Sequence, residues 1–184
     1  MPRWILCLPC FLVLLSTAVR PDSARAAGSD PLRLLLDERE LVRLTNEIDV
    51  AVDRKEWDRA RSFFTENVRV DFTSLVGGTA VTIKAGELIS GWRTNLFADK
   101  KTMHLRGNHL VTIDGDRATV YSHGYAWNQL PGVGTDLWEV WGNYTHEMTR
   151  TQQGWRVTAM TFVKTYERGN SLVRTFLPST TKGK

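Results

Sequence analysis

Apolar residues follow a helical spacing in the first half of the chain and a strand spacing in the second half. The first stripe recurs at intervals of three and four and consists of Leu41, Leu44, Ile48 and Val52. This spacing predicts an amphipathic helix. Asp37 and Glu40 resemble a capping box, so we expect the helix to begin near Asp37 after a lead-in at 27–36.

Shorter patterns complete the prediction. Helices are expected at 55–64 and 84–97, with a strand at 68–72 between them. Alternating residues then predict four strands, at 102–113, 117–127, 138–151 and 155–166. Helices followed by strands indicate an α+β fold, a cone-shaped α+β barrel in which N-terminal helices pack on a strongly curved antiparallel sheet. Such a cone has a mouth that suits a small-molecule site.

The first 26 residues have the features of a secretory signal peptide. Arg3 precedes an apolar run at 4–19, and a polar stretch ends in Ala24-Arg25-Ala26. A retained membrane anchor is the alternative, although 16 apolar residues interrupted by Pro9 are short for a span. We therefore expect a secreted or periplasmic protein with one domain at 27–168 and a loosely ordered tail at 169–184.

Composition excludes several classes of function. Both cysteines, Cys7 and Cys10, lie in the predicted signal, so the mature chain has no disulfide, thiolate metal site or cysteine nucleophile. The full chain of 184 residues carries a net charge of +4. Removal of the signal, with three arginines and one aspartate, leaves 21 basic and 19 acidic residues and a net charge of +2. This balance does not favour nucleic acid as a partner.

Histidines and acids remain as candidates for chemistry. Period-two alternation puts His104 and Asn108 on one strand face and His109 on the other. The histidines have no close-spaced ligand pair, so we predict no metal site. Along 117–127 one face carries Ala118, Ser122 and Ala126 while the other carries large aromatic residues, and the pattern leaves open which of them faces the interior.

Five short motifs, in their order and spacing, carry a family resemblance. They are Asp53–Arg59, Val68–Ser74, Thr102–His104, Asp114–Ala118 and Gly154–Val157. From Leu41 to Tyr166 the chain resembles the SnoaL-like branch of the nuclear-transport-factor-two-like superfamily. It is similar to scytalone dehydratase and, more loosely, to hexachlorocyclohexane dehydrochlorinase and the bile-acid 7α-dehydratases. The resemblance implies an α+β cone with an internal pocket, no cofactor, and assembly as a homodimer or homotrimer.

In the lyases of that family an aspartate at the end of the first helix orients a histidine on a later strand. The matching positions are Asp53 and His104. A histidine near its ordinary pKa can take up a proton near neutral pH, and a carboxylate on its other nitrogen fixes the tautomer. The helical stripe alone would leave Asp53 as a solvated acid, so the assignment rests on the resemblance.

Other pocket positions differ from those of the relatives. The two pocket tyrosines of scytalone dehydratase fall at Val52 and Phe72, and its later polar pair falls at Asn143 and Thr145. An arginine of the dehydrochlorinase falls at Met160. We expect the remaining substrate-binding residues to be Phe72, Asn108, Tyr121, His123, Trp141 and Asn143.

Two functions follow from the sequence. The first is an exported lyase or isomerase that uses Asp53 and His104 on a small apolar or cyclic substrate. The second is a non-catalytic module of the same fold that binds a ligand or a partner, because one fold supports both kinds of function. We expect no nucleic acid partner and no stable membrane insertion after signal cleavage.

Overall fold

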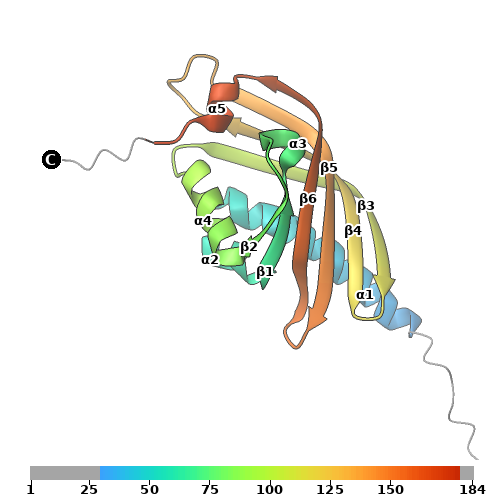
Figure 1. Ribbon diagram of the computed structural model, residues 1–184. Helices are drawn as coiled ribbons and strands as arrows, with labels where there is room; N and C mark the ends of the chain where they lie inside the picture. The colour runs from blue at the N-terminus through green and yellow to red at the C-terminus, as the bar shows by residue number, and fades with distance from the viewer. Residues whose placement is uncertain (1–29, 179–184) are drawn as a thin grey trace, which may run out of the picture.

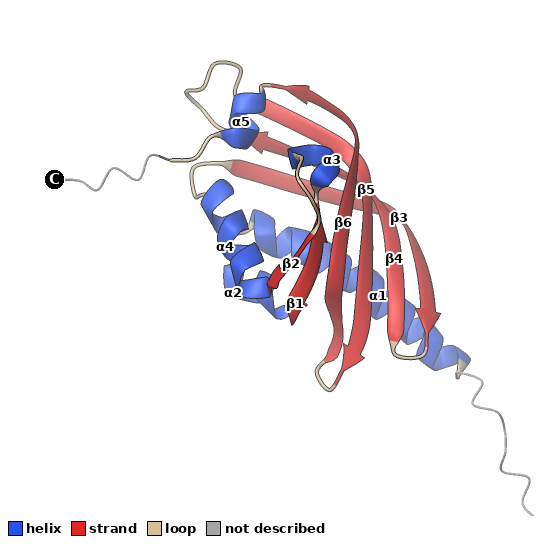
Figure 2. Ribbon diagram, viewed as in Figure 1, coloured by secondary structure: helices blue, strands red, loops and turns tan. Residues whose placement is uncertain are grey.

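The computed structural model describes residues 30–178, so the predicted signal at 1–26 lies outside the described residues. The helices are α1 (Pro31–Asp53), α2 (Trp57–Ser62), α3 (Thr73–Val76), α4 (Ala85–Asn95) and α5 (Ser171–Thr175). The strands are β1 (Phe64–Asp71), β2 (Val81–Lys84), β3 (Lys101–Asp114), β4 (Arg117–Gln129), β5 (Leu137–Thr151) and β6 (Gly154–Gly169). The predicted α+β class is confirmed, with helices on the concave side of one curved sheet (Figures 1 and 2).

The strands form one sheet in the order β2-β1-β6-β5-β4-β3. Neighbouring strands are antiparallel except for β1 and β6, which run parallel. β3 to β6 are 13 to 16 residues long, and they curve around α1, which crosses one face of the sheet (Figure 1). Because β2 and β3 remain as free edges, the sheet is a curved layer and does not close into a barrel.

α1 begins earlier than the sequence pattern predicts. Asp30 caps it, because its carboxylate accepts a hydrogen bond from the backbone nitrogen of Leu32, and Pro31 occupies the first turn. The predicted helix start at Asp37 is therefore wrong. The predicted lead-in at 27–36 is also wrong from residue 31 onward, where the chain is helical. Asp37 instead lies inside the helix, where its buried carboxylate pairs with a strand.

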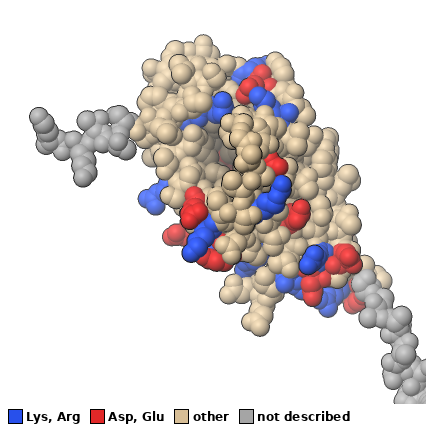
Figure 3. Space-filling model, viewed as in Figure 1, with Lys and Arg blue, Asp and Glu red and all other residues tan. Residues whose placement is uncertain are grey.

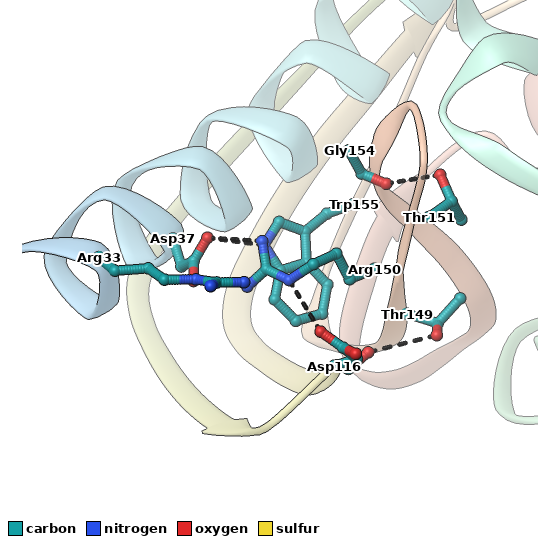
Figure 4. A network of polar contacts seen from close by, with 8 residues as sticks. All are labelled: Arg33, Asp37, Asp116, Thr149, Arg150, Thr151, Gly154 and Trp155. Atoms are coloured by element: carbon teal, nitrogen blue, oxygen red, sulfur yellow. Dashed lines mark hydrogen bonds and ion pairs between the residues drawn. The ribbon is translucent and has the colours of Figure 1, made fainter. Parts of the chain in front are cut away.

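An arginine network ties the start of α1 to the turns of the sheet (Figure 4). The two terminal nitrogens of Arg150 donate to the two carboxylate oxygens of Asp37 over 2.9 and 2.5 Å, and its Nε donates to Asp116 over 3.0 Å. The guanidinium also lies 4.3 Å from the centre of the Trp155 ring. Hydrogen bonds from Arg150 hold the pKa of Asp37 below its ordinary value despite burial.

The C-terminal segment is more ordered than predicted. Asn170 caps α5 by accepting a hydrogen bond from Leu172, and its side-chain nitrogen donates to the carbonyls of Val133 and Thr135. Val173 is fully buried against the inner face of the sheet. The prediction of a loose tail from residue 169 is therefore wrong for 169–175, because one buried valine and a capped turn anchor this segment.

The structure decides which face of β4 is internal. Ala118, Ser122 and Ala126 are buried, while Tyr121 and His123 lie on the opposite face. Small side chains on the inner face leave room for α1 and for a cavity. Among residues 30–178, no helix is long and apolar enough to span a bilayer.

Candidate functional site

A cavity of about 470 Å³ opens between the concave face of the sheet, α1, α4 and the C-terminal segment. Figure 3 shows the surface hollowed at this point, between the positions of α3, α4 and α5 in Figure 1. The lining is mainly apolar and includes Val52, Phe72, Trp92, Trp138, Val140 and Phe162. Its polar members are Asp49, Asn95, His104, Arg106, Asn128, Tyr144, Arg174 and Thr175. Such a mixture of apolar walls and few polar groups is typical of small-molecule sites.

The structure brings together Asp53 and His104. Asp53 Oδ1 lies 2.7 Å from His104 Nδ1, and Asp53 Oδ2 accepts a hydrogen bond of 2.7 Å from the backbone nitrogen of His104. The two side chains are 17% and 18% exposed. His104 lines the cavity and Asp53 lies behind it. The carboxylate therefore holds both the main chain and the ring of the histidine in one orientation.

The end of α1 places Asp53 for this contact. Lys55 adopts a left-handed backbone conformation with a φ of 62°, and its nitrogen donates to Val52 while the nitrogen of Glu56 donates to Ala51. This pair of bonds is a Schellman motif, which stops the helix directly after Asp53. The Asp53 carboxylate consequently projects from the last turn toward β3. Because the helix ends here, Asp53 reaches His104 although it lies off the apolar stripe of α1.

Further hydrogen-bond donors stabilise the ionised form of the Asp53 carboxylate. Thr102 Oγ1 donates to Asp53 Oδ1 over 2.9 Å, and Lys55 Nζ donates to Thr102 Oγ1 over 3.1 Å. Burial raises the pKa of Asp53, but hydrogen bonds from His104 and Thr102 and the electrostatic contribution of His104 outweigh it, so the pKa lies below its ordinary value. Asp53 is thus an anion across the neutral range, and its Oδ1 can accept a hydrogen bond from a proton on His104 Nδ1.

A buried ion pair lies beside Asp53 and His104. Asp49 precedes Asp53 by one helical turn, and its carboxylate accepts hydrogen bonds of 2.5 and 2.8 Å from Nε and a terminal nitrogen of Arg106. The Arg106 side chain is 1% exposed, and its guanidinium lies 3.6 Å from the centre of the Tyr144 ring. A Cβ on Gly124 would come within 2.5 Å of that ring, so this glycine makes room for Tyr144.

Tyr144 can serve as a hydrogen-bond donor at neutral pH. Burial raises the pKa of its phenol to about 12, against the opposing charge of Arg106. The sequence reasoning missed Asp49, Arg106 and Tyr144. One signal was available, because Asp49 lies next to Ile48 on the apolar stripe of α1, where a charged residue is rare unless it is paired.

Unpartnered polar atoms gather on the inner face next to this pair. Within residues 30–178, no hydrogen-bond partner exists for the remaining terminal nitrogen of Arg106, His109 Nε2, Ser122 Oγ or either ring nitrogen of His146. His146 is fully buried. Burial and the charges of Arg106 and His109 lower the pKa of His146 well below its ordinary value, so the folded domain holds His146 neutral.

This neutral histidine predicts a loss of stability in acid. Below about pH 6.5 the unfolded chain takes up a proton that the folded domain refuses, so the free energy of unfolding falls as pH falls. The slope from His146 is about 1.4 kcal/mol per pH unit. We expect His146→Leu to remove this slope between pH 6 and pH 5 in urea unfolding. A slope unchanged in the variant would contradict the buried neutral state.

Asn108 lies outside the cavity, so its predicted substrate-binding role is wrong. The register of β3 shifts between Gly107 and Leu110, and Asn108 adopts a left-handed conformation with a φ of 54°. This bulge inserts one residue and reverses the alternation. Asn108 therefore contacts His123 on the outer face over 2.9 Å, whereas His109 turns inward beside His146.

Four other predicted substrate-binding residues also miss the cavity. They are Tyr121, His123, Trp141 and Asn143, all on the outer face of β4 and β5. The phase of both strands is opposite to the one required, because Ala126 of β4 and Val140 and Tyr144 of β5 are among the residues that line the cavity. Phe72 does line the cavity, packed against Phe162. Among the described residues 30–178, no three histidine, cysteine, aspartate or glutamate side chains converge on a metal-sized site.

Comparison with known proteins identifies the family. A model described as a SnoaL-like domain matches residues 33–161. The chain belongs to the SnoaL-like domain family. The SnoaL-like chain is also 32% identical to the Kfla4162 protein from Kribbella flavida, with a TM-score of 0.73 over 77% of this chain and 99% of that one. No curated protein sequence matches it.

More distant structures share the fold of the SnoaL-like domain. A candidate scytalone dehydratase from Novosphingobium aromaticivorans is 15% identical, with a TM-score of 0.64 over 74% of this chain and 89% of that one. A type 2 hexachlorocyclohexane dehydrochlorinase is 15% identical, with a TM-score of 0.63 over 82% of this chain and 99% of that one. The predicted similarity to scytalone dehydratase is confirmed at the level of the fold, and further neighbours described as nuclear-transport-factor-two-like proteins confirm the predicted fold.

Proposed function

We propose that this SnoaL-like domain is a cofactor-independent lyase or isomerase for a small, mostly apolar cyclic carbonyl compound. The observation that carries the proposal is the 2.7 Å contact between Asp53 and Nδ1 of a histidine that lines the cavity. Asp53 contacts Nδ1 and so leaves Nε2 as the ring nitrogen available to a ligand. A ring oriented in this way offers one free lone pair to a ligand in the cavity.

The proposed reaction starts with proton transfer. His104 Nε2 accepts the proton from a carbon next to the carbonyl group, and the C–H electron pair moves into the carbonyl to form an enolate. Asp53 stabilises the imidazolium that results. In an elimination, the enolate re-forms the carbonyl, a C=C bond forms between the α- and β-carbons, and the bond between the β-carbon and its hydroxyl group breaks. The proton returned by His104 lets the hydroxyl leave as water. In an isomerisation, the proton returns to another carbon of the enolate.

Two residues of the cavity can stabilise the enolate oxygen. The tyrosines used by scytalone dehydratase are replaced by Val52 and Phe72, which carry no hydroxyl. Tyr144, whose high pKa keeps its phenol protonated, and Asn128 line the same cavity. Hydrogen-bond donors positioned in a dry site stabilise developing negative charge more strongly than water does. We assign this role to Tyr144 and Asn128.

Distant fold neighbours support the reaction class. The dehydratase and the dehydrochlorinase bear names that describe eliminations, and both share this fold. The export predicted from residues 1–26 would place the reaction outside the cytoplasm. A binding module without catalysis is the second candidate, and the apolar side chains of Val52 and Phe72 inside the cavity favour it.

Hydrogen exchange at carbon separates the two candidates. In D₂O, the wild type is expected to accelerate loss of the α-proton signals of a cyclic ketone, such as 2-tetralone, in ¹H NMR spectra. His104→Gln should reduce this acceleration at least about 100-fold, the range typical of a lost general base. His123→Gln, on the outer face, is the matched control and should leave it unchanged. No acceleration by the wild type across a panel of cyclic ketones, or equal rates for His104→Gln, would favour the binding module.

A further inference from the structure

One cationic side chain in the cavity wall forms no ion pair with any residue of 30–178. Arg174 of α5 lines the cavity, and its Nε is buried without a hydrogen-bond partner among residues 30–178. None of the ion pairs within 4 Å among the described residues includes Arg174, and its Nε is the guanidinium nitrogen that is both buried and unpartnered. The other permanent charges of the lining, Asp49 and Arg106, neutralise each other.

The main chain of Arg174 is held in place by two neighbouring elements. Its carbonyl oxygen accepts hydrogen bonds from Asn95 Nδ2 over 3.0 Å and from Lys100 Nζ over 3.5 Å, and Lys100 also donates to the carbonyl of Phe176 over 3.1 Å. The adjacent Val173 is fully buried. The guanidinium therefore starts from a fixed backbone, which lowers the entropic cost of binding a ligand.

The nearby acid Glu167 does not form an ion pair with Arg174. Glu167 lies close enough for the charge of Arg174 to contribute to its lowered pKa, but the main cause is its hydrogen bond to Lys164. Its two carboxylate oxygens already accept from Lys164 Nζ over 2.7 Å and from Trp138 Nε1 over 3.2 Å. The guanidinium of Arg174 lies 5.9 Å from the centre of the Trp138 ring. A guanidinium without an ion-pair partner beside an aromatic side chain favours a ligand that carries an anionic group on an apolar ring system.

The sheet register relates Arg174 to the proposed base. His104 of β3 pairs with Ala126 of β4. Asn128, two residues further along β4 on the same face, pairs with Trp138 of β5. Trp138 is two strands away from His104, which corresponds to about 10 Å across the sheet. A ligand with one or two fused rings spans this separation.

We propose that Arg174 binds a carboxylate of the ligand, so that the ligand is an apolar cyclic acid held at one end by Arg174 and exposed to His104 at the other. This inference rests on the proposed function only in taking the cavity as the substrate site. It adds a substrate class, the carboxylic acids, which the family fold does not specify. Arg174 acts in binding and takes no part in proton transfer.

Isothermal titration calorimetry with matched acids and amides tests this assignment. The probes are 1-naphthylacetate with 1-naphthylacetamide, and 4-phenylbutanoate with 4-phenylbutanamide, at pH 7.5 and low salt. In at least one pair, the wild type is expected to bind the acid at least about tenfold more tightly than the amide, as a charge-assisted hydrogen bond requires. Arg174→Gln should bind acid and amide within about twofold, with the amide affinity unchanged.

Three further variants sharpen the result. Arg174→Lys keeps the charge and should retain a preference of at least about threefold, while Arg168→Gln, whose partner Glu139 lies outside the cavity, should behave like the wild type. His104→Gln should keep the preference for the acid even where hydrogen exchange at carbon is lost. The binding role of Arg174 and the proton transfer by His104 are therefore tested separately. Equal binding of acid and amide by the wild type, a preference that survives in Arg174→Gln, or no acid binding at 10 mM would each overturn the assignment.

Discussion

Asparagine at position 53 is expected to lower the exchange rate at carbon by about 10²- to 10⁴-fold while the domain stays folded. The amide can donate to His104 Nδ1, which stabilises the tautomer that carries its proton on Nε2, and the cavity then faces an N–H group instead of a lone pair. It also removes the anion that stabilises the imidazolium. The measurement is kcat and kcat/KM for the ketone that the wild type exchanges fastest.

The matched control for this substitution is Asp58→Asn. Asp58 is an exposed aspartate of α2 outside the cavity, so it should retain wild-type rates. Circular dichroism and thermal melting of both variants separate a catalytic loss from an unfolded sample. A rate for Asp53→Asn within about threefold of the wild type would remove the carboxylate from the mechanism.

Substitution of Asp49 by leucine is expected to cost about 3–5 kcal/mol of unfolding free energy. The change leaves the guanidinium of Arg106 buried, 1% exposed, without its counterion. The double variant Asp49→Leu/Arg106→Leu removes both charges and should recover most of the loss, because an apolar pair of similar volume can replace a buried ion pair. Urea unfolding at pH 7.5 measures all three free energies.

An exposed ion pair provides the comparison. Glu66→Gln breaks the contact between Arg61 and Glu66, whose side chains are 34% and 65% exposed, and should cost less than about 1 kcal/mol. A loss below about 1 kcal/mol for Asp49→Leu, or a double variant no more stable than the single one, would show that the Asp49–Arg106 contact is not a buried structural pair.

The regular parts of the fold were predictable because apolar spacing reports directly on which residues are buried. The four long strands fall within a few residues of their predicted ends, and the stripe from Leu41 to Val52 lies in the core. The ends of elements were less predictable. α1 starts at Pro31 because a single side chain, Asp30, caps it, and α5 forms around Val173 because the sheet supplies the surface that buries it.

The site shows the same division. The Asp53–His104 pair came from the family resemblance, and the helix end at Asp53 brings the two side chains into contact. The substrate-binding prediction failed at Asn108 because a one-residue bulge reverses an alternation that a period of two assumes. It failed at Tyr121 and Trp141 because the phase of a strand depends on which face the helices cover, and alternation alone carries no such information.

The tautomer of His104, measured by ¹⁵N NMR on histidine-labelled protein at pH 8, tests the proposed proton transfer most directly. The chain has four histidines, so the His104 signals are assigned by their loss in His104→Gln. We predict a protonated Nδ1 that is hydrogen-bonded to Asp53 and an unprotonated Nε2 whose signal shifts when a cyclic ketone fills the cavity. A proton on Nε2 in the wild type, or an Nε2 signal that does not change with the ligand, would contradict the role of His104 as the base.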